Sequence, residues 1–217
     1  MIELERQGDV YILHMRGGEN RFNPESLAAI NEKLDEVEAS EGPAALVTTG
    51  EGKFYSNGLD LDRMTSEPDV TGAIIDGTHA LFGRLLGFPM YTVAACNGHT
   101  FAAGAMLALA HDERIMRSDR GWFCLPEVDI GMNFTPLMSA LIVARLPRLT
   151  AHRAMTTGKR YTAPEAIEAQ IALEAVGESE VLARAVALAQ PMAAKDRKMI
   201  GEVKRRIYAD VLALLED

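Results

Sequence analysis

Two hydrophobic periods alternate along this chain, and the change from one to the other marks its predicted elements. Residues 10–15 (VYILHM) and 44–49 (AALVTT) are short apolar runs rich in β-forming side chains, as is typical of strands. Between these runs, apolar residues recur at helical spacing: Leu27, Ile30, Leu34 and Val37. Asn23 followed by Pro24 suits the N-cap and first position of that helix. The pattern predicts a strand, a helix and a second strand in succession.

The rest of the chain continues this alternation. Further strands are predicted at residues 2–5, 89–96, 113–118 and 121–125, and further helices at residues 71–86, 135–146, 151–158 and 163–170. The tail, residues 180–217, has the pattern of an amphipathic helix whose basic residues form a solvated face. Strands alternating with helices predict an α/β fold with parallel strands, and 217 residues are consistent with one main domain.

Two loops that follow predicted strands are the first candidates for chemistry. In residues 50–61, Gly58 permits a backbone conformation closed to most residues, so the amide of Leu59 is free to point outward. In residues 94–105, small residues open a helix whose first N–H groups have no intrahelical partner. Strand, loop and helix units in succession place both loops on one edge of the sheet. A turn capped by Asp60 and close helix–strand packing are the simpler alternatives.

Glu127 is the acid that follows the second loop in a mostly apolar setting. Backbone donors and a nearby glutamate are the parts needed to remove a proton next to a carbonyl group. A loop carrying a solvated acid remains the alternative at this point.

Composition and charge narrow the function classes. A net charge of −9 and a pI near 5.1 argue against nucleic-acid binding, which needs a basic surface. No apolar run reaches membrane-spanning length and the start lacks a signal peptide's apolar segment, so a soluble, cytoplasmic protein is expected. Cys96 and Cys124 lie in apolar runs and are expected to be buried hydrophobes. No Cys/His spacing typical of a metal site is present, so no metal is expected.

Three segments together resemble the crotonase (enoyl-CoA hydratase/isomerase) superfamily, and most of all its Δ3,Δ2-enoyl-CoA isomerases of plant and peroxisomal type. They are KFYSNGLDL, AACNGHTFAAGAMLALAHDERIM and LPEVDIG, in this order and separation. The resemblance implies a crotonase-like spiral of strand–strand–helix turns over residues 1–170 and a C-terminal helical region, residues 171–217, with oligomer contacts. It further implies a homotrimer or a dimer of trimers, an acyl-CoA substrate of fatty acid metabolism, and no cofactor beyond the CoA of the substrate.

The resemblance also implies residue roles. The family holds a thioester carbonyl with two backbone amides, which match Leu59 and Ala103, and its catalytic acid in the Pro-Glu segment matches Glu127. Hydratases of the family carry a second glutamate where this chain has Met106, and a thioether cannot activate water, which favours an isomerase. The expected substrate-contacting residues are Asn57, Gly58, Asp60, Arg63, Ala102, Gly104, Met106, Leu125 and Phe134.

Other functions stay open from the sequence. Hydratase, decarboxylase and thioesterase activities share the same pair of backbone donors. The second loop has alanines where the family commonly has glycines. Because of this difference, an acyl-CoA binding protein without catalysis stays an alternative. The chain ends in Leu-Leu-Glu-Asp, which is no peroxisomal address, and this supports the cytoplasmic expectation.

Overall fold

The computed structural model describes residues 1–215 and contains two sheets. The large sheet has the strand order β1-β2-β3-β5-β7-β9, with β1 (Ile2–Gln7), β2 (Val10–Met15), β3 (Ala45–Gly50), β5 (Tyr91–Cys96), β7 (Glu113–Arg117) and β9 (Glu174–Val176). The small sheet has the order β4-β6-β8, with β4 (Phe54–Ser56), β6 (His99–Phe101) and β8 (Phe123–Cys124). Apart from the β1–β2 hairpin, all the strand pairs are parallel, which confirms the predicted α/β fold.

The helices connect these strands. They are α1 (Pro24–Glu38), α2 (Leu61–Ser66), α3 (Thr71–Leu86), α4 (Ala103–Ala110), α5 (Pro136–Arg145), α6 (Arg148–Thr157), α7 (Ala163–Glu168), α8 (Val181–Ala189), α9 (Arg197–Ile207) and α10 (Ala209–Leu212). Single turns of 3-10 helix lie at Pro68–Val70, Glu178–Glu180, Gln190–Met192 and Ala213–Leu215. Helix α3 has the predicted bounds, and Asn23 caps α1 as predicted, with its side chain accepting a hydrogen bond from the Ser26 amide.

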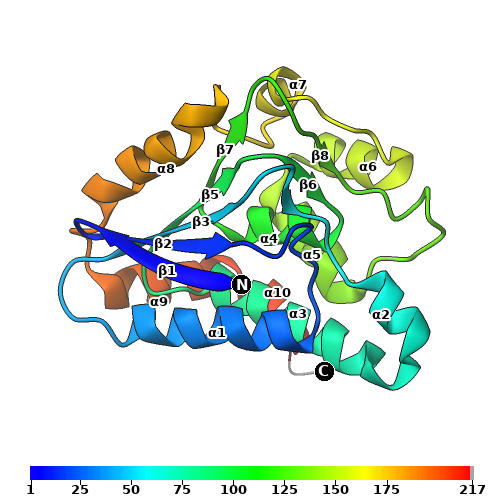
Figure 1. The fold of residues 1–217 in the computed structure, drawn as a ribbon, viewed down its shortest axis with the longest axis horizontal. Coiled ribbons are helices and arrows are strands. Elements are labelled where there is room, and N and C mark those ends of the chain that lie inside the picture. Colours follow the sequence, from blue (N-terminus) through cyan, green and yellow to red (C-terminus); the bar gives the residue numbers. More distant parts are fainter. Residues whose placement is uncertain (216–217) are drawn as a thin grey trace.

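Both faces of the large sheet are covered, because alternate strand residues enter two separate apolar clusters. Val47 and Val93 pack on the face that α8 covers, together with Ala185. Leu46 and Ala94 point to the opposite face, which is covered by α1, α3, α4 and α5 (Figure 1). Burial on both faces explains why these strands are continuous apolar runs rather than alternating ones.

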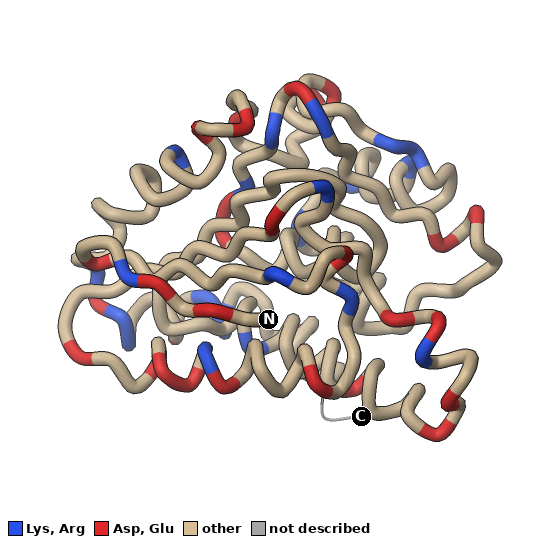
Figure 2. The backbone as a smooth tube through the Cα atoms, in the orientation of Figure 1, with Lys and Arg blue, Asp and Glu red and all other residues tan. Residues whose placement is uncertain are grey.

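Helix α4 at the centre of the fold carries no charged residue (Figure 2). Every residue of α4 is buried, and five of its eight residues are Ala or Gly. Within residues 1–215, no helix combines the length and apolar character needed to cross a bilayer.

The tail is helical, as predicted, but the helix is interrupted. Residues 181–212 form α8, α9 and α10; a 3-10 turn that contains Pro191 lies between α8 and α9, and Tyr208 lies between α9 and α10. Proline removes a backbone donor and interrupts a helix, and Asp196 then starts α9 by accepting a hydrogen bond from the Met199 amide at 2.9 Å. Residues 216–217 of the predicted helix lie outside the described residues.

The basic residues of this tail are not all solvated, contrary to the prediction. Lys204 is buried, and its ammonium donates hydrogen bonds to the Asp112 carboxylate at 2.8 Å and to the Met90 carbonyl at 3.1 Å. Arg197 donates to the Glu38 carbonyl at 2.9 Å. These contacts fix α9 against the amino-terminal ends of the central strands and the end of α1.

Candidate active site

The small sheet brings the three candidate groups together. Its strands are parallel, so their carboxyl ends lie on one edge, where ligands of such sheets bind. Leu59 follows the end of β4, Ala103 follows the end of β6, and Glu127 follows the end of β8, each by two or three residues. The parallel pairing therefore places three segments far apart in the sequence at one edge.

The first donor turn is held by a bridge to the segment that precedes α1. Phe22 donates its amide to the Gly58 carbonyl at 2.8 Å and accepts from the Asp60 amide at 3.0 Å. In a parallel bridge of this kind the flanking residues make the hydrogen bonds, and the N–H of the central residue points to the other side. Leu59 is the central residue, and within residues 1–215 its amide donates to no protein group.

The second donor is the first amide of α4. Ala102 precedes the helix with φ +50° and ψ −127°, an uncommon conformation for a residue other than glycine. The amide of Ala103 starts the helix and so has no intrahelical acceptor. In the described part of the chain, it donates to no other group either.

The two turns are in direct contact through glycines. A Cβ atom placed on Gly58, whose φ is +85°, would lie 2.9 Å from the Ala103 nitrogen and 3.2 Å from the Phe101 carbonyl oxygen. A Cβ atom on Gly104 would lie 2.5 Å from the Ser56 carbonyl oxygen. The distances of 2.9 Å and 2.5 Å are too short for a Cβ atom, so these glycines are what allows the two backbones to approach.

Glu127 supplies an acid without a partner. It lies in a turn closed by hydrogen bonds from the Asp129 amide to the Pro126 carbonyl and from the Met132 amide to the Glu127 carbonyl, both at 2.9 Å. Its side chain is buried, and its Oε2 atom has no hydrogen-bond partner among the described residues. Burial raises the pKa of Glu127 to about 7, against the lowering effect of a hydrogen bond from its own backbone.

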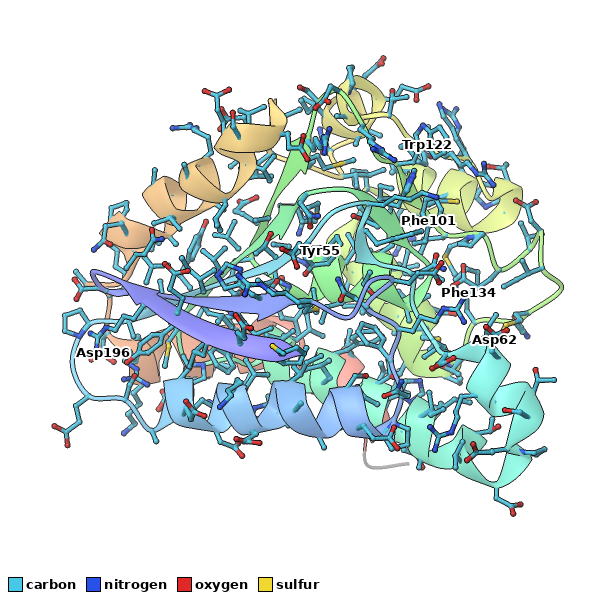
Figure 3. The ribbon with its side chains drawn as sticks, in the orientation of Figure 1. Tyr55, Asp62, Phe101, Trp122, Phe134 and Asp196 are labelled. Atoms are coloured by element: carbon cyan, nitrogen blue, oxygen red, sulfur yellow. The ribbon has the colours of Figure 1, made fainter. Side chains whose placement is uncertain are left out.

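These groups share one cavity of about 310 Å³. Its lining residues are Arg21, Asn57, Leu59, Leu61, Asp62, Ile75, Phe101, Ala102, Ala103, Met106, Pro126, Glu127, Ile130, Met132, Asn133, Thr135 and Met138. Figure 3 labels Phe101 and Asp62 of this lining. The inner wall is largely apolar and the polar groups are few, as is typical of small-molecule sites. Two outward amides and one buried carboxylate are suited to removing a proton next to a carbonyl group.

The other predicted site residues lie around this cavity rather than on its surface. Gly58 and Gly104 form the contact between the turns, and Leu125 is fully buried behind the wall. Phe134 is partly buried against the apolar core (Figure 3). Their predicted contacts with a substrate stay predictions.

Asp60 and Arg63 have partners within the protein. Asp60 caps α2 by accepting a hydrogen bond from the Arg63 amide at 3.3 Å, and it accepts a second one from Asn23 at 3.1 Å. The Arg63 guanidinium contacts Glu67 at 2.8 Å and Glu25 at 3.5 Å. Neither residue lines the cavity, so their predicted contact with a substrate stays a prediction.

Sequence reasoning missed several lining residues, and the reason differs between them. Ile130 and Met132 lie close to Glu127 in the sequence, so their proximity to the acid was available as a signal. Arg21 precedes α1 and Ile75 belongs to α3, and they reach the cavity only through the packing of those helices. No local motif distinguishes Arg21 or Ile75 from other residues of their kind.

A second hollow, of about 570 Å³, lies near the amino terminus and is less suited to chemistry. Its carboxylates, Glu19, Glu25 and Asp60, are each paired with an arginine or hydrogen-bonded. Within residues 1–215, no group of three or more His, Cys, Asp or Glu side chains has an arrangement suited to a metal ion. Cys96 and Cys124 are buried free thiols, as predicted.

Known proteins resemble this chain over nearly its whole length. Residues 6–216 match the family model described as enoyl-CoA hydratase/isomerase. The chain is 36% identical to the peroxisomal enoyl-CoA delta isomerase 2 of Arabidopsis thaliana, over 99% of this chain and 95% of that protein.

Solved structures show the same fold. A probable enoyl-CoA hydratase of Mycobacterium tuberculosis superposes with a TM-score of 0.92 at 28% identity, covering 99% of this chain and 91% of the other. A second structure of that same protein, there named an enoyl-CoA isomerase, superposes with a TM-score of 0.91 at 28% identity, covering 99% and 94%. The fold is therefore crotonase-like, and a fold alone does not establish a reaction.

Proposed function

The chain belongs to the enoyl-CoA hydratase/isomerase family and is an enzyme of that family, and we propose that it moves the double bond of a 3-enoyl-CoA to the 2-position. One observation carries this proposal: Glu127 is buried with its Oε2 atom unpartnered, and it shares a cavity with the Leu59 and Ala103 amides, which donate to no group within residues 1–215. Three relatives at 31–36% identity are named enoyl-CoA delta isomerases, and these names support the same reaction.

In the proposed mechanism, the thioester oxygen accepts hydrogen bonds from the Leu59 and Ala103 amides. Glu127 removes a proton from C2, and the electron pair of the broken C–H bond delocalises over the thioester and the double bond as a dienolate. Each amide is worth about 3 kcal/mol in the transition state, since the negative charge develops on the oxygen that it faces. Glu127 then returns the proton to C4, which leaves the double bond between C2 and C3.

The environment of Glu127 suits both halves of this transfer. Because burial raises its pKa to about 7, the group is a stronger base than an exposed glutamate and still ionises near neutral pH. A carboxyl group whose pKa lies near the working pH accepts and releases a proton with similar ease.

Hydration is the main alternative, and the cavity lining disfavours it. Met106 is buried and lines the cavity where a second acid is needed to activate water. Asp62 lines the cavity, but it is exposed and paired with Arg21. Asp129 is exposed and Glu113 starts β7, and neither of these two lines the cavity. Decarboxylase and thioesterase activities, or acyl-CoA binding without catalysis, use the same amides and are outcomes of the test below.

The test compares two reactions on the purified enzyme over a series of acyl chain lengths. We expect 3-enoyl-CoA isomerisation to exceed 2-enoyl-CoA hydration by at least about 100-fold in kcat/KM, because one base suffices for the first reaction and not for the second. Robust hydration would contradict the isomerase assignment. Binding of acyl-CoA without turnover of either substrate would favour the binding-only alternative.

Assembly and location belong to the same proposal. The exposed side chains of Met199, Val203 and Ile207 recur every fourth residue along α9, which supports the predicted oligomer contacts of residues 171–217. We propose a homotrimer or dimer of trimers that uses no cofactor apart from the CoA of its substrate. Analytical ultracentrifugation of the wild-type protein and of Val203→Glu tests the oligomer. A cytoplasmic location stays a prediction, since a relative at 36% identity is peroxisomal.

A further inference from the structure

A chain of buried hydrogen bonds joins β4, β3 and the end of α4. Thr48 Oγ1 lies 2.7 Å from the Tyr55 hydroxyl and 2.9 Å from His111 Nε2, and His111 Nδ1 lies 2.8 Å from the Leu107 carbonyl oxygen. All four residues are at most 3% exposed. No part of the proposed mechanism uses these side chains, and none of them lines the cavity.

The direction of each hydrogen bond follows from chemistry. A carbonyl oxygen only accepts, so His111 Nδ1 carries the proton and donates to Leu107. Burial lowers the pKa of His111 to about 4, so the ring is neutral and its Nε2 atom accepts from Thr48. The Thr48 oxygen must then accept from Tyr55. The donor sequence runs from Tyr55 to Thr48, to His111 and into α4.

This chain connects the two elements that carry the proposed donors. Tyr55 is the central residue of β4, the strand that leads to Leu59, and it lies in the middle of the molecule (Figure 3). His111 is the C-cap of α4, the helix that begins with Ala103. Thr48 belongs to β3 of the large sheet, whose position is set by two neighbouring strands.

The same end of α4 is fixed by further hydrogen bonds. Arg145 donates to the Leu109 carbonyl and to the Asp112 carbonyl, both at 2.8 Å. Arg114 donates to the His111 carbonyl at 3.2 Å. The carboxyl end of α4 is thus held by directional contacts, while the side chains of the helix are all apolar and mostly small. Packing of small apolar side chains alone defines the tilt of a helix weakly.

We propose that Tyr55, Thr48 and His111 are positioning residues that set the tilt of α4 relative to β4 and thereby the separation of the Leu59 and Ala103 amides, an inference that rests on the proposed function. An eight-residue helix is about 12 Å long, so a tilt of about 5° at its carboxyl end moves its first amide by about 1 Å. A displacement of about 1 Å in a catalytic group is enough to cost up to about 100-fold in rate.

Thr48→Val tests this inference, because valine has nearly the shape of threonine but breaks both links at once. Thr78→Val is the matched control: Thr78 is equally buried, but its hydroxyl only donates to the Ile74 carbonyl within α3. Thr48→Ser restores the hydroxyl, and Tyr55→Phe removes only the first link. If Thr48→Val folds poorly, Tyr55→Phe still tests the inference.

Two measurements separate positioning from general stability. The first is kcat and KM for 3-enoyl-CoA isomerisation. The second is the infrared carbonyl stretch of bound hexanoyl-CoA labelled with ¹³C at the thioester, which falls in frequency when amides polarise the carbonyl. Hexanoyl-CoA is saturated and therefore is not isomerised.

For Thr48→Val we expect kcat to fall about tenfold with KM within about twofold, and the carbonyl shift to shrink. Tyr55→Phe should show a smaller fall in kcat and a smaller loss of the carbonyl shift. For Thr48→Ser and Thr78→Val, kcat should stay within about twofold of wild type and the carbonyl shift should be complete. A full shift and unchanged kcat in both Thr48→Val and Tyr55→Phe would overturn the positioning role alone. Absence of any shift in the wild type would overturn the proposed pair of donors, and the inference with it.

Discussion

The two donor turns present an amide to the same cavity, but they reach that geometry in different ways. Gly58 has φ +85°, and a Cβ atom there would also collide with the Ala103 nitrogen, so the first turn needs glycine for conformation and for space. Ala102 has φ +50° and ψ −127°, which is the conformation of the first central residue of a type II′ turn, a position dominated by glycine. The second turn therefore holds an alanine under backbone strain.

This difference shows which property of each turn matters. At Gly58 the close approach of the backbones leaves no alternative residue. At Ala102 the strain costs roughly 1–3 kcal/mol of stability without any gain that glycine would not also give. We therefore expect replacement of Gly58 to impair the enzyme, and replacement of Ala102 by glycine to stabilise it.

The largest effect is expected when both turns stay intact and only the base is removed. Glu127→Gln keeps the shape of the side chain but cannot accept the proton, so we expect kcat for isomerisation to fall by about 1,000-fold or more. The affinity for a saturated acyl-CoA should stay within about twofold, because both amides remain. Steady-state kinetics and calorimetry check this, with Glu174→Gln on the half-buried edge strand β9 as the control. Activity within a few-fold of wild type would remove Glu127 from the mechanism.

Gly58→Ala should be next in size. The added methyl group would meet the Ala103 nitrogen at 2.9 Å, so one or both turns must move and the two donors no longer face one oxygen. We expect kcat/KM to fall about 100-fold, as for the loss of one oxyanion donor. Gly72→Ala in α3 has open space around its Cβ and serves as the control, with unchanged activity. If Gly58→Ala kept full activity, the contact between the turns would have no catalytic role.

The third effect in size is the pH dependence of isomerisation, which reports the pKa of the base and leaves both turns unchanged. In the proposed mechanism the active form of Glu127 is the carboxylate, and burial raises its pKa to about 7. The kcat/KM for isomerisation should therefore be constant above about pH 7.5 and fall tenfold per pH unit below about pH 6.5. A profile that stays flat down to pH 5 would show that the free enzyme's base has an ordinary pKa.

The same raised pKa affects stability with a defined sign. The folded state binds the Glu127 proton more tightly than the unfolded state, in which the pKa is near 4.5. Burying the carboxylate therefore costs nothing below about pH 4.5 and destabilises the fold progressively up to about pH 7, by a few kcal/mol at most. Chemical denaturation of wild type and Glu127→Gln should show a stability difference that grows over this pH range.

The smallest effect, and the one of opposite sign, is expected for Ala102→Gly. Glycine relieves the strain at φ +50° but has more freedom in the unfolded chain, which offsets part of the gain. We expect about 1 kcal/mol of added stability, or a melting temperature about 3 °C higher, with activity within threefold of wild type. Calorimetry alongside the isomerase assay measures both. A destabilised Ala102→Gly variant would mean that the alanine methyl contributes packing that outweighs the strain.

Local signals in the sequence were enough for the long elements. Asn23 and Pro24 marked the start of α1, and the apolar pattern at residues 71–86 gave α3 its full length. In the tail, Pro191 is a local signal for the interruption between α8 and α9, whereas the burial of Lys204 against Asp112 depends on how the chain folds back on the core. From the sequence alone, a basic residue on a helical face is predicted to be solvated, whether or not a carboxylate lies next to it in the folded protein.

For the candidate site, the sequence by itself determined the parts: an acid in an apolar segment, and two turns rich in small residues that can expose the amides of Leu59 and Ala103. Only the tertiary structure decided their arrangement. Strands β4 and β6 have three residues each, too short for any periodic pattern, and β8 lies within the predicted strand at residues 121–125. The three strands form one sheet because they pair with one another in parallel. The bridge to Phe22 that turns the Leu59 amide outward and the burial that raises the pKa of Glu127 are likewise contacts between residues distant in sequence. Hydrogen-bond direction and desolvation depend on such neighbours in space, which no local run of residues specifies.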